Sequence, residues 1–102
     1  MIRFKRGDTR YALKATLKRN GTPADLTGCT VRFFMSNGRI TINRPVDILD
    51  PVNGLVWVIF DQGDTDTVGT YRAEFEVTHA DGRKETFPSS GYLRLQLVPD
   101  LG

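Results

Sequence analysis

The sequence predicts an all-β fold, an antiparallel sandwich or barrel, on three observations. Residues 70–78 alternate without exception, with Tyr71, Ala73, Phe75 and Val77 on one side and polar or charged residues on the other. This period of two marks a strand with one buried and one solvated face. Other segments of strand length are separated by turns rich in Gly, Asn and Asp. No segment repeats apolar residues at the spacing of an amphipathic helix.

Length and composition limit the class of protein. A chain of 102 residues, 39% of them hydrophobic, has the size of one soluble globular domain. Because 14 Lys and Arg face 12 Asp and Glu, the net charge is only +2, which argues against a nucleic-acid surface. The longest apolar run, residues 55–60, is too short to span a membrane, and no signal peptide is expected at the N-terminus. The single cysteine, Cys29, excludes an intrachain disulfide and is expected to be a small buried hydrophobe.

The first half of the chain divides into strands at its turn signals. Asn20-Gly21 and Asn37-Gly38 are strong hairpin signals, because Asn and Gly tolerate the positive φ of tight turns. Pro45 cannot donate to a ladder, so it is expected to interrupt a strand at a sheet edge. We therefore expect strands at residues 2–5, 10–18 and 29–36, and two short pieces at 40–43 and 46–49.

The second half contains one strand without an obvious inner face. After the Asn53-Gly54 turn, residues 55–61 are largely apolar on both sides, so this strand is either central in the domain or covered by a partner. Further strands are expected at 70–78, 84–88 and 92–98. The expected core consists of the inward positions of these strands: Leu13, Leu17, Val31, Phe33, Trp57, Tyr71, Phe75, Val77, Leu93, Leu95 and Leu97.

A short segment resembles a corner of immunoglobulin-like domains. The residues from Thr67 to Ala73, TVGTYRA, are similar to the corner before strand F, where a Tyr hydroxyl bonds back to the backbone. Antibody domains have Asp where this chain has Thr67 and Cys where it has Ala73. The resemblance therefore implies a disulfide-free relative of these domains, in which Tyr71 closes the corner.

The order of signals along the chain resembles one family in particular. Gly7-Asp8-Thr9, Asp25-Leu26-Thr27-Gly28 and Gly69-Thr70-Tyr71 occur at separations similar to those in the immunoglobulin-like N-terminal domain of phage baseplate upper proteins, and in small phage and prophage tail proteins. The resemblance implies an immunoglobulin-like antiparallel β-sandwich of about seven or eight strands, spanning residues 1–102 as one domain.

The same resemblance implies a function without catalysis. We expect a phage or prophage tail or baseplate structural module that needs no cofactor. It would assemble with other tail or baseplate proteins and form a homo-oligomer, without nucleic acid or membrane insertion. It would be made in the bacterial cytoplasm and end in the virion. The alternative is a ligand-binding sandwich for carbohydrate or calcium, using loops at one end. An aromatic platform with carboxylates near it would favour this alternative.

Few residues suggest chemistry of their own. Asp61, Asp64 and Asp66 share one loop and could hold Ca²⁺, which prefers oxygen ligands, but a polar corner with Asx turns is the favoured interpretation. His79, the only histidine, ends a strand beside a turn, where a solvated side chain is expected.

Apolar residues outside the expected core suggest an interface. Phe34 lies opposite the core face of its strand. In the strand at 55–61, either Val56, Val58 and Phe60 or the alternate set of Leu55, Trp57 and Ile59 must face outward. We take Phe34, Val56, Val58 and Phe60 as interface candidates, since a joined apolar patch on a surface marks an interaction site. Cover by a loop or by the segment 40–49 is the alternative.

Overall fold

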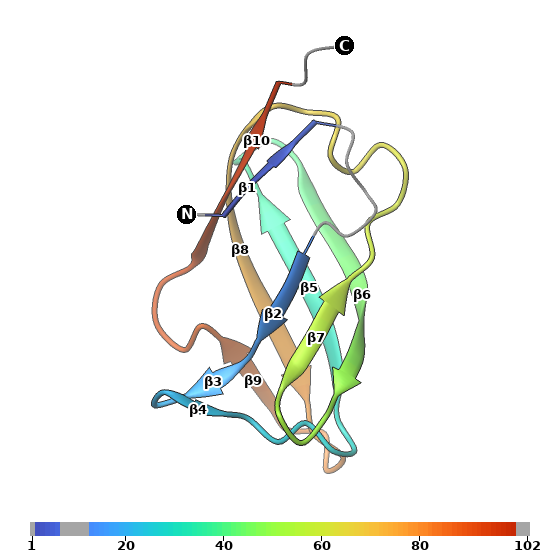
Figure 1. The fold of residues 1–102 in the computed structure, drawn as a ribbon, viewed down its shortest axis with the longest axis vertical. Coiled ribbons are helices and arrows are strands. Elements are labelled where there is room, and N and C mark those ends of the chain that lie inside the picture. Colours follow the sequence, from blue (N-terminus) through green and yellow to red (C-terminus); the bar gives the residue numbers. More distant parts are fainter. Residues whose placement is uncertain (1, 7–12, 100–102) are drawn as a thin grey trace.

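Every regular element of the computed structural model is a β-strand, within the residues that it describes, 2–6 and 13–99 (Figure 1). None of these residues forms a helix that could cross a membrane. The predicted Gly7-Asp8-Thr9 turn and the start of the second predicted strand lie outside the described residues. The strands are β1 (Ile2–Lys5), β2 (Leu13–Thr16), β3 (Lys18–Arg19), β4 (Thr22–Pro23), β5 (Thr30–Ser36), β6 (Thr41–Asp50), β7 (Leu55–Val58), β8 (Gly69–Thr78), β9 (Lys84–Phe87) and β10 (Leu93–Val98).

The strands form two layers that share one long strand. Hydrogen-bonded neighbours follow the order β1-β10-β8-β5-β6-β7-β2, and β9 pairs with β8. The first half of β6 pairs with β5 and its second half pairs with β7, so the chain passes from one layer to the other along β6. In Figure 1, β2 and β7 lie across β5 and β8. Neighbours within these layers are antiparallel, except that β1 runs parallel to β10.

This arrangement confirms the predicted disulfide-free sandwich. The strand count exceeds the expected seven or eight for two local reasons. First, β3 and β4 are a two-residue hairpin, in which Asn20 and Gly21 both have the positive φ that a tight turn of this kind requires. Second, the strand returning along β8 is split, because β9 pairs with residues 75–78 and β10 with residues 69–73.

The predicted interruption at Pro45 is wrong, since β6 runs unbroken from Thr41 to Asp50. Pro45 is the last residue of β6 paired with β5, opposite Arg32, and the pairing with β7 begins at Val46. Each half of β6 therefore has one unpaired edge, and a residue without an N–H fits at the point where the pairing changes sides.

The core lies between the layers and contains most of its predicted members. Trp57 and Leu93 are only half-buried, which corrects two predictions. In β7 the inner face belongs instead to Val56 and Val58, which have no exposed surface. The buried hydrophobic residues are Leu13, Leu17, Ala24, Leu26, Val31, Phe33, Met35, Ile42, Val56, Val58, Phe60, Tyr71, Ala73, Phe75, Val77, Phe87, Leu95 and Leu97.

The corner before β8 has the predicted geometry. The buried Tyr71 hydroxyl donates a hydrogen bond of 2.8 Å to the carbonyl oxygen of Thr67. Burial raises the pKa of Tyr71, so the phenol stays protonated and remains a donor. The contact spans four residues of one segment, which explains why a local motif was enough to predict it.

Candidate functional site

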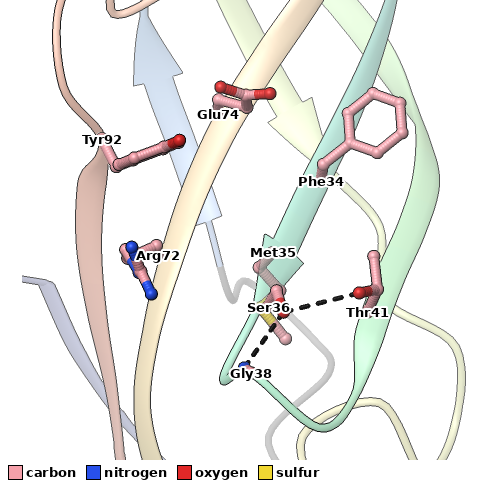
Figure 2. Close-up of a pocket in the computed structure, with 8 residues that line it drawn as sticks. All are labelled: Phe34, Met35, Ser36, Gly38, Thr41, Arg72, Glu74 and Tyr92. Atoms are coloured by element: carbon pink, nitrogen blue, oxygen red, sulfur yellow. Dashed lines mark hydrogen bonds between the residues drawn. The ribbon is translucent and has the colours of Figure 1, made fainter.

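A hollow of about 310 Å³ opens on the outer face of the layer that contains β8 (Figure 2). Tyr92, just before β10, stands on one side of it, and Phe34 of β5 stands on the other. Arg72 and Glu74 lie on β8 between them. Its lining residues are Phe34, Met35, Ser36, Gly38, Thr41, Arg72, Glu74 and Tyr92.

Sheet register aligns polar side chains in and beside the hollow in two rows, of which Arg94 and Asn43 are not lining residues. In one row, neighbouring positions on β10, β8, β5 and β6 are Arg94, Arg72, Ser36 and Thr41. In the next row, Glu74 lies opposite Phe34, and Phe34 lies opposite Asn43. Tyr92 precedes Leu93, which pairs with Ala73, and Figure 2 shows its ring beside Glu74. The alternation of each strand directs both rows to the outer face.

The charges in the hollow and directly beside it have few partners of their own. The Arg72 guanidinium lies 5.7 Å from the centre of the Tyr92 ring, and Arg94 directly opposes Arg72 across the strands. Two like charges in directly opposed positions destabilise a sheet. Among the described residues, neither Arg94 nor Glu74 makes an ion pair or a side-chain hydrogen bond.

Elsewhere on this face several charged side chains are paired. Arg3 donates to Gln96 over 2.9 Å, and Arg32 donates to Asn43 over 2.6 Å. Lys84 lies 3.5 Å from Glu76. The hollow therefore combines two aromatic rings with Glu74, which has no side-chain partner among the described residues, and with Arg72, whose guanidinium lies over the Tyr92 ring.

The outer face of β7 carries the second notable surface. Leu55, Trp57 and Ile59 alternate there, because Val56 and Val58 occupy the inner positions. The Lys14 ammonium lies 5.6 Å from the centre of the Trp57 ring. The Trp57 Nε1–H is shielded from solvent and has no acceptor among the described residues, which costs about 1–3 kcal/mol.

Two of these findings bear on the predicted interface residues. Val56, Val58 and Phe60 are core residues, so their assignment to an interface is wrong. Val58 pairs with Leu13 and Val46, whereas Trp57 pairs with charged residues on both sides. These neighbours fix which side of β7 faces the core. Phe34 does face outward, half-buried at the edge of the hollow.

Arg44 forms ion pairs with two aspartates of the Asp61–Asp66 loop, the candidate calcium site. Arg44 donates to both carboxylate oxygens of Asp64, through Nε and Nη2, each over 2.6 Å. Asp64 is 8% exposed and also accepts the backbone N–H of Asp61 over 2.8 Å. Asp61 lies 3.4 Å from Arg44, and Asp66 is exposed. Within residues 2–6 and 13–99, no three acidic, His or Cys side chains are arranged to hold a metal ion.

Sequence reasoning missed a chain of four side chains near the β8–β9 turn. Cys29 Sγ lies 3.4 Å from Nδ1 of His79, and His79 Nε2 lies 3.0 Å from Glu85. Arg19 donates to both oxygens of Glu85 over 2.6 Å. His79 and Cys29 are both half-buried. His79 is paired and not solvated as expected, and Cys29 packs against the core without being fully buried.

The order thiol, imidazole and carboxylate is that of an activated nucleophile, but the electrostatics differ. Burial raises the pKa of Cys29, so the thiol keeps its proton at neutral pH. The Arg19 guanidinium lowers the pKa of Glu85 to about 2, with a smaller contribution from His79. We interpret the group as a structural link that ties the β3–β4 hairpin to β9.

The family model described as the BppU N-terminal domain matches residues 1–89. No curated protein matches the chain.

Proposed function

Because the chain belongs to the family of the BppU N-terminal domain, found in the phage baseplate upper protein, we propose that it is a non-catalytic assembly module. Family membership makes it a phage baseplate structural domain, associated with tail or baseplate proteins of the virion. We propose further that it acts through protein–protein contacts and forms a homo-oligomer. The proposed domain comprises residues 1–102, because β10 lies beyond the matched residues yet pairs with both β1 and β8.

The observation that supports this function is an apolar surface on the layer formed by β2, β7 and the second half of β6. We call it the β7 outer face and define it by Leu49, Leu55, Trp57 and Ile59. Leu49 is 43% exposed and Ile59 is 45% exposed, and they flank two half-buried apolar side chains. Apolar centres with a polar rim are typical of protein interfaces.

The rim of this surface carries both signs of charge. Lys14 and Asp47 are the exposed neighbours of Trp57 on β2 and β6. A second copy of the chain could oppose its own carboxylate to this lysine, as a two-fold interface requires. Phe34 lies on the other layer and is not part of this surface.

The test is the solution mass of the purified 102-residue chain, measured by light scattering over a range of concentrations. We expect an oligomer whose fraction rises with concentration, and we expect Ile59→Lys to shift the population to monomer, because a buried charge without a partner opposes association. Ile40→Lys is the matched control, since Ile40 is 40% exposed and lies in the β5–β6 turn. A monomer at every concentration, or equal effects of the two substitutions, would contradict the proposed homo-oligomer.

The same measurement tests the calcium alternative. We expect no change in mass or thermal stability on adding Ca²⁺, because Arg44 already neutralises Asp64. A calcium-dependent increase in either quantity would revive a role for the Asp61–Asp66 loop.

A further inference from the structure

The hollow on the outer face of β8 has the chemical groups of a sugar-binding site. Its volume of about 310 Å³ is at the lower end of the range for small-molecule sites, about 300–1,000 Å³. Phe34 is in β5 and Tyr92 immediately precedes β10, the strands on either side of β8, so their backbones are about two strand spacings, or about 10 Å, apart. Two aromatic walls at this separation leave room for a flat ring above β8 (Figure 2).

The aromatic walls suit the faces of a pyranose ring. The C–H groups on such a face are weakly positive, and they meet the negative face of an aromatic ring favourably. Tyr92 is 56% exposed, and its phenol is one of the largest exposed apolar groups on the described surface. The exposed ring of Tyr92 is therefore accessible to a ligand that enters the hollow.

The polar groups select the substituents. The Glu74 side chain makes no ion pair or hydrogen bond among the described residues, so its carboxylate oxygens can accept from two ring hydroxyls. Arg72 and Arg94 oppose each other without an acidic neighbour in their row. The arrangement costs stability in the free protein and favours a carboxylate, which arginine binds with two parallel hydrogen bonds.

We propose that the hollow between Tyr92 and Phe34 binds an acidic glycan. A pyranose ring packs between the two aromatic side chains, with its hydroxyls on Glu74. Its anionic substituent lies over the row of Arg72 and Arg94, beside the hydroxyls of Ser36 and Thr41. The site is on the face of the sheet, not in the end loops, and it goes beyond the proposed assembly function.

The experiment is an NMR titration of the ¹⁵N-labelled chain with glucuronic acid and galacturonic acid, up to about 50 mM, as expected for a single-sugar site. Glucose is the uncharged control, and acetate is the control for the charge alone. We expect saturable shifts at the amides of residues 34–36, 72–74 and 92–94. Glucose and acetate should each bind at least about fivefold more weakly than the uronic acids.

Variants separate the two parts of the site. Tyr92→Ala and Arg72→Gln should each weaken binding at least about fivefold, whereas Tyr92→Phe keeps the ring and should change it less than about twofold. Arg83→Gln removes an arginine from the exposed β8–β9 turn and is the charge control.

Several results would overturn the proposal. These are the absence of saturable shifts with either uronic acid, equal binding of acetate, and equal binding of glucose. Binding that survives Tyr92→Ala would also overturn it. An acidic peptide that shifts the same amides while the sugars do not would assign the hollow to a protein partner instead.

Discussion

At the scale of single residues, Tyr71 closes the corner before β8 with one hydrogen bond to Thr67. The phenol is fully buried, so removing its hydroxyl leaves the Thr67 carbonyl without this donor. We expect Tyr71→Phe to lower the free energy of unfolding by about 1 kcal/mol. Urea denaturation measures this change, and Tyr92→Phe, on an exposed ring, should leave stability unchanged. Equal midpoints for the wild type and Tyr71→Phe would show that the corner does not depend on the bond.

Glu85 gives a second prediction, which depends on pH. Its folded pKa of about 2 lies below the usual 4.5, because Arg19 binds the charged form. The stabilisation is therefore complete above pH 4.5 and is lost as the pH falls towards 2. Since the Arg19 side chain is 43% exposed, we expect only about 1 kcal/mol.

The measurement compares wild type and Glu85→Gln by urea denaturation at neutral and acidic pH. The variant should be less stable at pH 7 by about 1 kcal/mol, and the difference in stability should disappear near pH 2. Asp81→Asn breaks a more exposed ion pair with Arg83 and is the control. A stability difference that persists at the acidic end would assign the effect to packing.

The contacts of Tyr71 and Glu85 also differ in how far the sequence could predict them. Tyr71 and Thr67 are four positions apart, so a local motif contains the entire interaction. Arg19 and Glu85 are 66 positions apart, and Cys29 and His79 are 50 apart. Only the pairing of distant strands brings them together, and no spacing in the sequence encodes that contact.

At the scale of elements, the β6–β7 turn depends on one glycine. Gly54 has a φ of +68°, and a Cβ there would lie 2.7 Å from the carbonyl oxygens of both Leu17 and Ala24. Its own carbonyl accepts the N–H of Leu17, so the turn cannot move aside without breaking a hydrogen bond. We expect Gly54→Ala to destabilise the domain by about 3 kcal/mol or more, from backbone strain and overpacking together.

The matched control is Gly82→Ala in the β8–β9 turn. Gly82 has a φ of +87°, but nothing lies within 4 Å of the position of its Cβ. Only the strain of the left-handed conformation applies there, about 1–2 kcal/mol. Thermal or urea denaturation of the two variants compares the costs. If both lose the same stability, the close approach to Leu17 and Ala24 does not matter.

The strand β7 explains why one element could be located from the sequence but not oriented. Its start follows from the Asn53-Gly54 turn, whereas the apolar run predicted a strand to residue 61 and β7 ends at Val58. Both of its faces are apolar, so alternation does not indicate which face is buried. The neighbouring strands β2 and β6 determine the buried face, since Lys14 and Asp47 oppose Trp57 and apolar residues oppose Val58. Those pairings are properties of the sheet, and a sequence without known register does not contain them explicitly.

At the scale of the whole molecule, the sandwich separates its two candidate surfaces. The hollow lies on the layer of β10, β8, β5 and the first half of β6, whereas the β7 outer face belongs to the other layer. Alternation and turn order predicted an antiparallel sandwich or barrel, and the resemblance to immunoglobulin-like domains implied the sandwich. The sequence did not predict the hollow, because Glu74 and Phe34 are in two different strands, Tyr92 precedes a third, and only the register brings them together.

This separation makes the two proposed activities independent, and independence can be measured. Substitutions on one layer change contacts on that layer, and sites with no shared partners contribute additively. We expect Tyr92→Ala to weaken the binding of uronic acids without changing the solution mass. Ile59→Lys should have the opposite effect, converting oligomer to monomer while uronic acid binding stays within about twofold of the wild type.

The double variant should combine the two losses without interaction, as measured by light scattering and NMR titration on the same samples. If Ile59→Lys also abolished sugar binding, the hollow would be complete only in the oligomer, and a second copy would have to contribute to it. If Tyr92→Ala instead changed the mass, the aromatic walls would themselves be a contact between copies. Either result would show that sugar binding and oligomer formation depend on a common surface.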